Sequence, residues 1–477
     1  MGEEIRSSDF SQADFAIFKR KLETETAQLA QLFSQQGFAQ SHPVAGFELE
    51  AWLIDDRWRP VPRNEEFLSR FANPLASPEL ASFNIEINTE PRSLQGHVFS
   101  AMHQSLDATW QACRDTAHAM GIDVIMCGIL PTVMDADLNL ANMSGMQRYR
   151  ALNREVLQRR LGKPLVFDIN GVEHLHVSHT DVMLESAATS FQLHTQVNQD
   201  LAVRWYNASQ ILSAPMVALC ANSPYLFAKD LWDETRIPLF EQAVAVGGYD
   251  AAAFGPLRRV TFGSGYARES LFECFVENLE HYPVLLPVNL DHNCATLPHL
   301  RLHNGTVWRW NRPLIGFDET GKPHLRIEHR VIPSGPSSLD AVANAAFYYG
   351  AAMALVNLPT APELLLPFAQ ARDNFYRAAQ LGLRAQLHWL DDKIYLANEL
   401  LLKLLLPLAQ QGLDLLGVAS SDSAEYLGII RQRLETGTNG AGWQRAFVGK
   451  HGRDMQALTA AYFQHQNSGQ PVHEWKI

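Results

Sequence analysis

The clearest structural signal in this chain lies at residues 46–50, Gly46-Phe47-Glu48-Leu49-Glu50, where acidic and apolar side chains alternate. Successive side chains of a β-strand point to opposite faces of the sheet. Glu48 and Glu50 therefore share one face, while Phe47 and Leu49 share the other. The segment predicts a strand with one face toward the core and one face that carries carboxylates.

Three further segments alternate in the same way, and they carry acidic, imidazole or guanidinium groups: Asn84-Ile85-Glu86-Ile87-Asn88-Thr89-Glu90, His174-Leu175-His176 and Arg326-Ile327-Glu328-His329-Arg330. If the four predicted strands join in one sheet, these groups gather on one face. Such a face is unstable unless cations and anionic ligands fill it, because buried charges need partners. The pattern therefore predicts a site for metal ions and a nucleotide.

The composition is typical of a globular protein: of 477 residues, 47% are hydrophobic and 19% are charged. The net charge is −12 and the chain has no basic block, which argues against nucleic-acid binding. An acidic enzyme can still bind nucleotides, because metal ions and local arginines set the sign of the charge inside a site.

The cysteines and the apolar segments indicate a cytoplasmic protein. None of the five cysteines forms a CxxC pair, which is typical of reduced thiols. The first residues lack the basic start and apolar core of a signal peptide. The most apolar stretch, residues 211–227, is interrupted by Pro215, Asn222 and Pro224 and predicts buried core rather than a membrane span. We expect no membrane partner, and a homo-oligomer is left open.

Hydrophobic periodicity predicts an α+β architecture. A helix is expected over about 10–36, where apolar residues recur at helical spacing before Gly37. Another helix is predicted over about 186–212, and strands over 300–332. After Pro336 the chain becomes rich in Ala and Leu. We therefore predict a catalytic α+β body with an N-terminal helix over 1–336, and a helical part over 337–477 that packs on the same core.

Five residues are candidate metal ligands. Hard divalent cations such as Mg²⁺ and Mn²⁺ prefer oxygen ligands, and imidazole is acceptable beside carboxylates. The candidates are Glu48, Glu50, Glu86, His176 and Glu328. Glu90, at the rim of its strand, is an alternative ligand for metal or for a substrate ammonium. The other interpretations are a solvent-facing strand edge for the acids, and a zinc pair or a core histidine for the His-x-His segment.

Candidate anion-binding residues form a second group. Arginine suits carboxylate and phosphate oxygens because its planar fork donates two parallel hydrogen bonds. The candidates are Arg309 and Arg330 for charge stabilisation, and Arg312, Arg326 and Gln192 for ligand binding. Glu328 between two arginines is also compatible with a simple salt-bridged strand. Gln192 and Gln196, four residues apart in the predicted helix, are also compatible with helix packing on the sheet.

Taken together, these segments resemble the glutamate–cysteine ligase family, of the type that includes bacterial carboxylate–amine ligases. The similar segments occur in family order from about residue 45 to 385. They are Gly46-x-Glu48-x-Glu50, residues 85–91, residues 173–177, residues 191–197, Asn222-Ser223-Pro224, Arg326-x-Glu328-x-Arg330 and residues 372–383.

The resemblance implies a glutamine-synthetase-like fold, in which a curved antiparallel sheet surrounds ATP and Mg²⁺, with Mn²⁺ as an alternative metal. It implies an ATP-dependent ligase that joins an amino-acid carboxylate to an amine through an acyl phosphate, forming a γ-glutamyl bond. By resemblance, the five candidate ligands correspond to metal-binding positions, and Arg330 to an arginine near the transferred phosphate. The chain departs from the family pattern after His176, where Val177-Ser178-His179 replaces glycine.

Two other functions stay open at this point. A metallohydrolase built on His174 and His176 would bind zinc and need no nucleotide. A regulatory protein that kept the fold without catalysis would bind a nucleotide or an amino acid and release no ADP. The sequence does not identify the amine acceptor, the pathway or the number of metal ions.

Overall fold

A computed structural model describes residues 4–5, 9–246, 258–290 and 294–477 of the chain. Its central element is an eight-stranded sheet with the strand order β13-β14-β8-β1-β3-β2, in which β4 and β5 also pair with β1. Every pairing in this sheet is antiparallel. The strands are β1 (Val44–Ile54), β2 (Ala76–Pro78), β3 (Asn84–Asn88), β4 (Arg92–Ser93), β5 (Asp123–Ile125), β8 (Ser190–Val197), β13 (Asn311–Phe317) and β14 (Pro323–Pro333).

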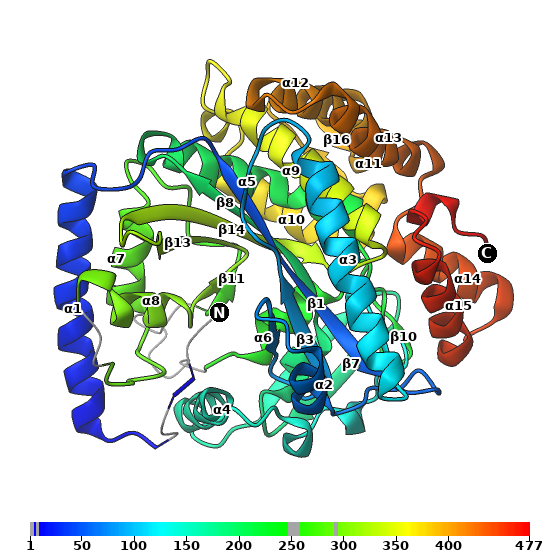
Figure 1. Cartoon of the computed structure of the whole chain (residues 1–477), viewed down its shortest axis with the longest axis horizontal. Coiled ribbons are helices and arrows are strands. Elements are labelled where there is room, and N and C mark those ends of the chain that lie inside the picture. Colours follow the sequence, from blue (N-terminus) through cyan, green and yellow to red (C-terminus); the bar gives the residue numbers. More distant parts are fainter. Residues whose placement is uncertain (1–3, 6–8, 247–257, 291–293) are drawn as a thin grey trace.

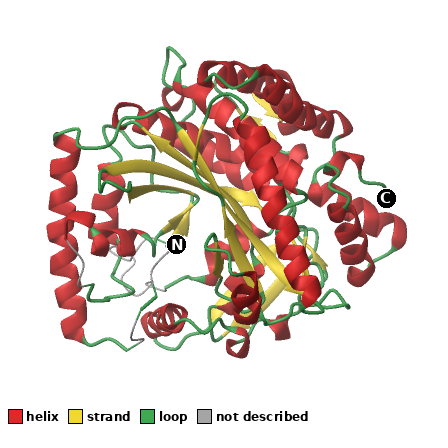
Figure 2. Cartoon of the chain, in the orientation of Figure 1, coloured by secondary structure: helices red, strands yellow, loops and turns green. Residues whose placement is uncertain are grey.

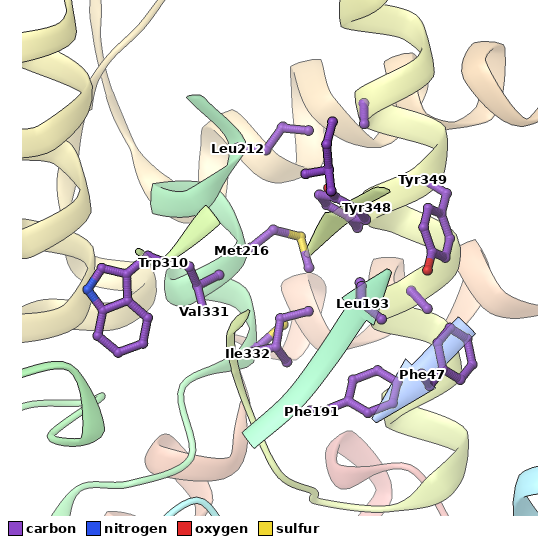
Figure 3. Close-up of a cluster of buried hydrophobic side chains, with 14 of the residues drawn as sticks. Phe47, Phe191, Leu193, Leu212, Met216, Trp310, Val331, Ile332, Tyr348 and Tyr349 are labelled. Atoms are coloured by element: carbon purple, nitrogen blue, oxygen red, sulfur yellow. The ribbon is translucent and has the colours of Figure 1, made fainter. Parts of the chain in front are cut away.

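Helices cover the apolar face of this sheet (Figures 1 and 2). They are α3 (Val98–Ala119), α5 (Gln199–Cys220) and α9 (Ser338–Val356). Phe47 of β1 packs edge-to-face on Phe191 of β8, with ring centroids 5.1 Å apart. Figure 3 shows these rings beside Leu193, next to Tyr349 of α9. Alternation in β1 therefore buries one set of side chains against helices and leaves the acidic set on the other face.

The remaining elements surround this core. The helices are α1 (Gln12–Ser34), α2 (Asn64–Phe71), α4 (Gln147–Arg159), α6 (Arg236–Ala243), α7 (Phe272–His281), α8 (Pro298–Asn304), α10 (Phe368–Leu381), α11 (Ala397–Leu400), α12 (Leu406–Leu416), α13 (Ser420–Thr436), α14 (Gly440–His451) and α15 (Met455–Asn467). Two-stranded sheets are formed by β6 (Leu165–Asn170) with β7 (His174–His179), β9 (Tyr225–Leu226) with β10 (Lys229–Asp230), β11 (Val260–Thr261) with β12 (Trp308–Arg309), and β15 (Gln386–His388) with β16 (Ile394–Leu396).

Helix α9 lies at the centre of the helical layer. Among the described residues it is the one helix long and apolar enough to cross a membrane, yet 89% of its most apolar window is buried inside the protein. Its Asp340 forms an ion pair with Arg433 of α13, 2.5 Å apart and almost fully buried. One hydrophobic cluster includes Phe47 and Leu193 as well as Tyr349 and Leu413. Residues on both sides of position 336 thus share a core, and the division into two parts stays a prediction.

The predicted fold class is confirmed: helices flank a curved antiparallel sheet, and the N-terminal helix is present as α1. Two elements were predicted wrongly. Residues 300–304, which fall in the region predicted as strands, belong to helix α8 (Pro298–Asn304). Residues 190–197 form strand β8, and the helix that follows, α5, begins only at Gln199. The segment Phe191-Gln192-Leu193-His194 alternates apolar and polar residues, which is the period of a strand. The four-residue spacing of Gln192 and Gln196 fits both a helix and a strand. The segment pairs with β1 on one side and β14 on the other, and it is therefore a strand.

We expect Gly412→Ala in α12 to destabilise the protein by about 1–3 kcal/mol or more, because overpacking a tight contact forces the backbone to shift. A Cβ at this position would overlap the carbonyl oxygen of Gly350 in α9. Gly428 in α13 is the matched control, because a Cβ there meets no atom within 4 Å. Gly428→Ala should raise stability by up to about 1 kcal/mol through helix propensity. Chemical denaturation measures both, and equal stability of the two variants would contradict the close packing of α9 and α12.

Candidate active site

Four neighbouring strands contribute side chains to the acidic face of the sheet. Glu50 of β1 lies directly opposite Glu86 of β3. On the other side of β1, Glu48 pairs in register with Gln192 of β8. His194 of β8 then lies opposite Glu328 of β14. Because residues directly opposite each other share a face, these side chains all project to the same side of the sheet.

The first cluster joins Glu48, His194 and Glu328, which each offer a ligand atom within 4.8 Å of the others. His194 Nε2 lies 3.2 Å from a carboxylate oxygen of Glu48 and 4.0 Å from one of Glu328. Burial opposes ionisation of Glu48, but His194 and Arg326 outweigh it and hold the pKa of Glu48 well below its usual range. Burial likewise opposes ionisation of Glu328, but the charge of Arg312 leads the contributions that lower its pKa. Both carboxylates are therefore negatively charged at neutral pH.

The second cluster consists of Glu50, Glu79 and Glu86, again with ligand atoms within 4.8 Å of one another. Burial, with repulsion from neighbouring carboxylates, raises the pKa of Glu86 well above its usual value and that of Glu79 to about 8. Glu86 Oε1 accepts a hydrogen bond from Asn88 at 2.8 Å. Its other oxygen, Oε2, and Oε1 of Glu79 are buried and have no hydrogen-bond partner among the described residues. Arg148 brings an opposing charge near Glu79, and Arg330 and Arg236 do so near Glu50.

Both clusters fit divalent cations. A hard cation such as Mg²⁺ binds carboxylate oxygens, and Ca²⁺ or Mn²⁺ would find the same donors. The buried oxygens of Glu79 and Glu86 that lack partners are the groups that such an ion would satisfy. Glu48 and Glu50 are two residues apart on one strand face, so the two clusters adjoin. The donor set therefore fits a site for more than one ion.

A cavity opens beside the second cluster. Its lining includes Glu50, Glu79, Glu185, Arg236 and Arg330. Burial, followed by the charge of Glu50, raises the pKa of Glu185 to about 8. Arg330 Nη1 is buried and has no hydrogen-bond partner among the described residues. A buried guanidinium with a free donor is suited to a phosphate or carboxylate oxygen of a ligand.

The other predicted ligand-binding groups lie close by but are partly occupied. Arg312 makes a bidentate pair with Glu328, at 2.9 and 2.8 Å. Gln192 donates to Glu50 at 3.0 Å and accepts from Arg330 at 3.2 Å. Arg326 is half-buried beside the first cluster, and its Nε is buried and has no hydrogen-bond partner among the described residues. Arg312 therefore positions Glu328, whereas Arg326 and Arg330 keep donors for a ligand.

Arg309 does not join this group. It belongs to β12, where its guanidinium donates to Asn278 of α7 at 2.7 Å and lies 3.3 Å from Glu277. It also stacks over the ring of Tyr282, 5.5 Å from the centroid. Proximity to Arg312 in the sequence suggested a shared role. The structure corrects this expectation, because side chains three residues apart point to opposite faces of an extended chain.

His176 is also not where the sequence analysis expected it. It lies on the separate β6–β7 hairpin, where its ring is exposed and groups with His174 and Asp168 rather than with Glu48. The imidazole beside Glu48 and Glu328 is His194. Alternation made His174 and His176 strand neighbours, but it does not specify to which sheet the strand belongs. The remaining rim candidate, Glu90, is exposed just beyond the end of β3.

Four residues of the site were missed. His194 could have been found, because it alternates with Phe191, Leu193 and Thr195 in a strand-like segment. Glu79 lies between β2 and β3, Glu185 in a short 3-10 helix over Met183–Ala187, and Arg236 at the start of α6. None of these three stands in a periodic pattern of charged residues, so the sequence carries no local signal for them.

Known proteins support this architecture. The family model of glutamate–cysteine ligase family 2 matches residues 44–463. The structure is similar to a glutamate–cysteine ligase from Francisella tularensis in complex with AMP, with a TM-score of 0.53, 13% identity, and 91% of this chain and 90% of that chain covered. It is also similar to a bifunctional glutathione synthetase from Pasteurella multocida, with a TM-score of 0.52 and 12% identity. That alignment covers 93% of this chain and 54% of the other.

No curated protein sequence matches this chain significantly. At 12–13% identity, the two structures establish the fold alone. The family model carries the assignment, because it extends from the first acidic strand, β1, into α15 and thus includes both carboxylate clusters. The chain therefore belongs to glutamate–cysteine ligase family 2, a family of ATP-dependent ligases.

Proposed function

We propose that this protein joins the γ-carboxylate of glutamate to an amine through an acyl-phosphate intermediate, using Mg²⁺ and ATP. The observation that carries the proposal is the pair of adjoining carboxylate clusters on one sheet face, beside a cavity with the free donor of Arg330. Like charges at such distances are unfavourable unless a ligand neutralises them. A metal–triphosphate complex is a ligand that brings cations and anions to the same place.

The metal ligands in this proposal are Glu48, His194 and Glu328 in one cluster, and Glu50, Glu79 and Glu86 in the other. When bound, divalent ions there would neutralise phosphate oxygens and orient the γ-phosphate for transfer. The protein's own contribution is positional. The pairing of Arg312 with Glu328, and of Gln192 with Glu50, fixes two of the ligand carboxylates before substrate arrives.

The reaction balances with these groups. A carboxylate oxygen of the donor attacks the γ-phosphorus, the bond from phosphorus to the bridging oxygen breaks, and ADP leaves. The amine nitrogen then attacks the acyl carbon, phosphate leaves, and the ammonium loses a proton. Phosphorylation is needed because a carboxylate has no usable leaving group. Arg330, and Arg326 on the other side of Glu328, would hold the transferred phosphate through their free donors.

The rival functions find less support. The pair His174 and His176 lies on an exposed hairpin, outside the lining of the cavity. A hydrolase built on it would have no enclosed substrate site. A regulator without catalysis would have no need for a second carboxylate cluster. The small-molecule substrates, the cytoplasmic location and a homo-oligomeric state remain predictions, and the amine acceptor is open.

Neutralising a ligand should abolish turnover without unfolding the protein. Glu86→Gln is expected to lower Mg²⁺-dependent ADP release at least about 100-fold, because a metal contact contributes several kcal/mol to transition-state stabilisation. Its melting temperature without metal should not fall, because Gln removes like-charge repulsion at a buried position. The exposed Glu90→Gln is the matched control and should keep full activity. Wild-type ADP release by Glu86→Gln, with amino acids offered singly and in pairs, would refute the proposed site.

The two histidine positions give a second comparison. Removing the imidazole beside Glu48 in His194→Ala should raise the Mg²⁺ concentration for half-maximal ADP release by about tenfold or more. His176→Ala should leave this concentration unchanged, because its ring is exposed on the hairpin. A Mg²⁺ titration of both variants measures the difference. If His176→Ala raised this Mg²⁺ concentration and His194→Ala did not, His176 rather than His194 would be the ligand of the proposed metal site.

The contribution of Glu185 to the stability of the metal-free protein should fall as pH rises. Burial raises the pKa of Glu185 in the folded protein to about 8, from an ordinary value of 4.5. Between these values the native state keeps a proton that the unfolded state has lost, so stability falls over this range by about 1.4 kcal/mol for each pKa unit. Glu185→Gln should flatten this dependence, and saturating Mg²⁺ should reduce it. Denaturant titrations at several pH values provide the measurement, and parallel pH dependences of the wild-type protein and Glu185→Gln would contradict the assignment.

A further inference from the structure

A second group of metal-binding side chains lies on the β6–β7 hairpin, apart from both carboxylate clusters. Asp168 of β6 lies directly opposite His176 of β7. His174 is two residues from His176, so both rings project from one face, and the directly opposed Asp168 shares that face. The side chains of His174, His176 and Asp168 are 54%, 58% and 52% exposed. An ion could reach all three directly from solvent.

The distances suit a small metal ion. His174 Nε2 lies 2.8 Å from Asp168 Oδ1, and His176 Nδ1 lies 3.6 Å from Asp168 Oδ2. The three ligand atoms lie within 4.8 Å of one another. Bonds of about 2.1 Å in a tetrahedral site would separate ligand atoms by roughly 3.4 Å. Small side-chain rotations would therefore bring all three groups to bonding distance.

The backbone that carries these side chains is already fixed. The other face of the hairpin buries Leu165, Phe167 and Ile169 in the core. Gln242 of α6 accepts from the backbone amide of Asp168 at 2.8 Å. The ammonium group of Lys229 donates a hydrogen bond to the backbone carbonyl of His174 at 2.7 Å. A metal ion would therefore order only side chains, which keeps the entropic cost of binding low.

The ligand types select the class of ion. Two imidazole nitrogens and one carboxylate oxygen match borderline transition metals such as Zn²⁺, Ni²⁺ and Cu²⁺, whereas Mg²⁺ prefers oxygen alone. We propose that His174, His176 and Asp168 bind one such ion at the surface, with water completing its coordination. The hairpin is a binding site apart from the proposed catalytic cavity, and it does not depend on the ligase chemistry.

Zinc titration of the full chain in excess Mg²⁺ tests this proposal by difference, because any zinc held by His194 beside Glu48 is the same in every hairpin variant. Calorimetry should show one equivalent of Zn²⁺ more for the wild-type protein than for the double variant His174→Ala/His176→Ala. His176→Ala should weaken binding by about tenfold or more, because losing even an outer-shell partner typically costs 10–100-fold. Asp168→Asn should also weaken it. His281→Ala is the matched control, since this histidine is equally exposed, at 58%, and should leave the equivalent in place.

Two further measurements separate the hairpin from the catalytic site. Glu86→Gln should keep the zinc equivalent even if it loses ADP release, so the two proposals fail independently. Cu²⁺ bound to the wild-type protein should show coupling to two imidazole nitrogens in electron paramagnetic resonance, and His174→Ala should show one fewer. The proposal is overturned if the wild-type protein binds no Zn²⁺ in excess Mg²⁺, or if the double variant His174→Ala/His176→Ala retains the equivalent.

Discussion

Repulsion among buried carboxylates is the constraint around which this structure is organised. Glu50 and Glu86 face each other across two strands, and Glu79 joins them from a loop. In water such groups ionise near pH 4, but here burial raises the pKa of each, and repulsion from neighbouring carboxylates adds to this for Glu79 and Glu86. A protein gains nothing in stability from this arrangement. In the proposed function it is a preformed cradle: folding gathers the like charges, and cations and phosphates would neutralise them on binding.

The rest of the fold keeps that cradle rigid. One side of β1 and β8 packs Phe47, Phe191 and Leu193 against the helical layer, where α9 is almost wholly buried (Figure 3). The ring of His329 stacks on Tyr348 of α9 at 4.3 Å. Burial lowers the pKa of His329 to about 3, so this histidine is a neutral core residue although it lies between Glu328 and Arg330. Because successive residues of a strand point to opposite faces, His329 lies in the packed hydrophobic layer while its neighbours Glu328 and Arg330 lie on the charged face.

The histidines show how tertiary environment assigns chemistry. His194 lies between two buried carboxylates, His329 lies in the core, and His174 and His176 project into solvent from a hairpin. All four occupy strands that alternate polar and apolar positions. What distinguishes them is the neighbouring strand: β8 joins the central sheet between β1 and β14, whereas β7 pairs with β6 in a two-stranded sheet. The hairpin pair therefore acquires Asp168 as its partner, and the sheet histidine acquires Glu48 and Glu328.

Local pattern alone determined much of this protein. The alternation in residues 46–50, 84–90 and 326–330 specified three strands, their polar face and Glu48, Glu50, Glu86 and Glu328 on it, and the ordered segments indicated the family. Tertiary structure decided what depends on contacts between distant residues. It replaced His176 with His194 and added Glu79, Glu185 and Arg236. It also placed the guanidinium of Arg309 against α7, away from the site. The physical reason is that side-chain direction along a strand follows from backbone geometry, whereas the choice of partner strand depends on long-range packing that no local period records.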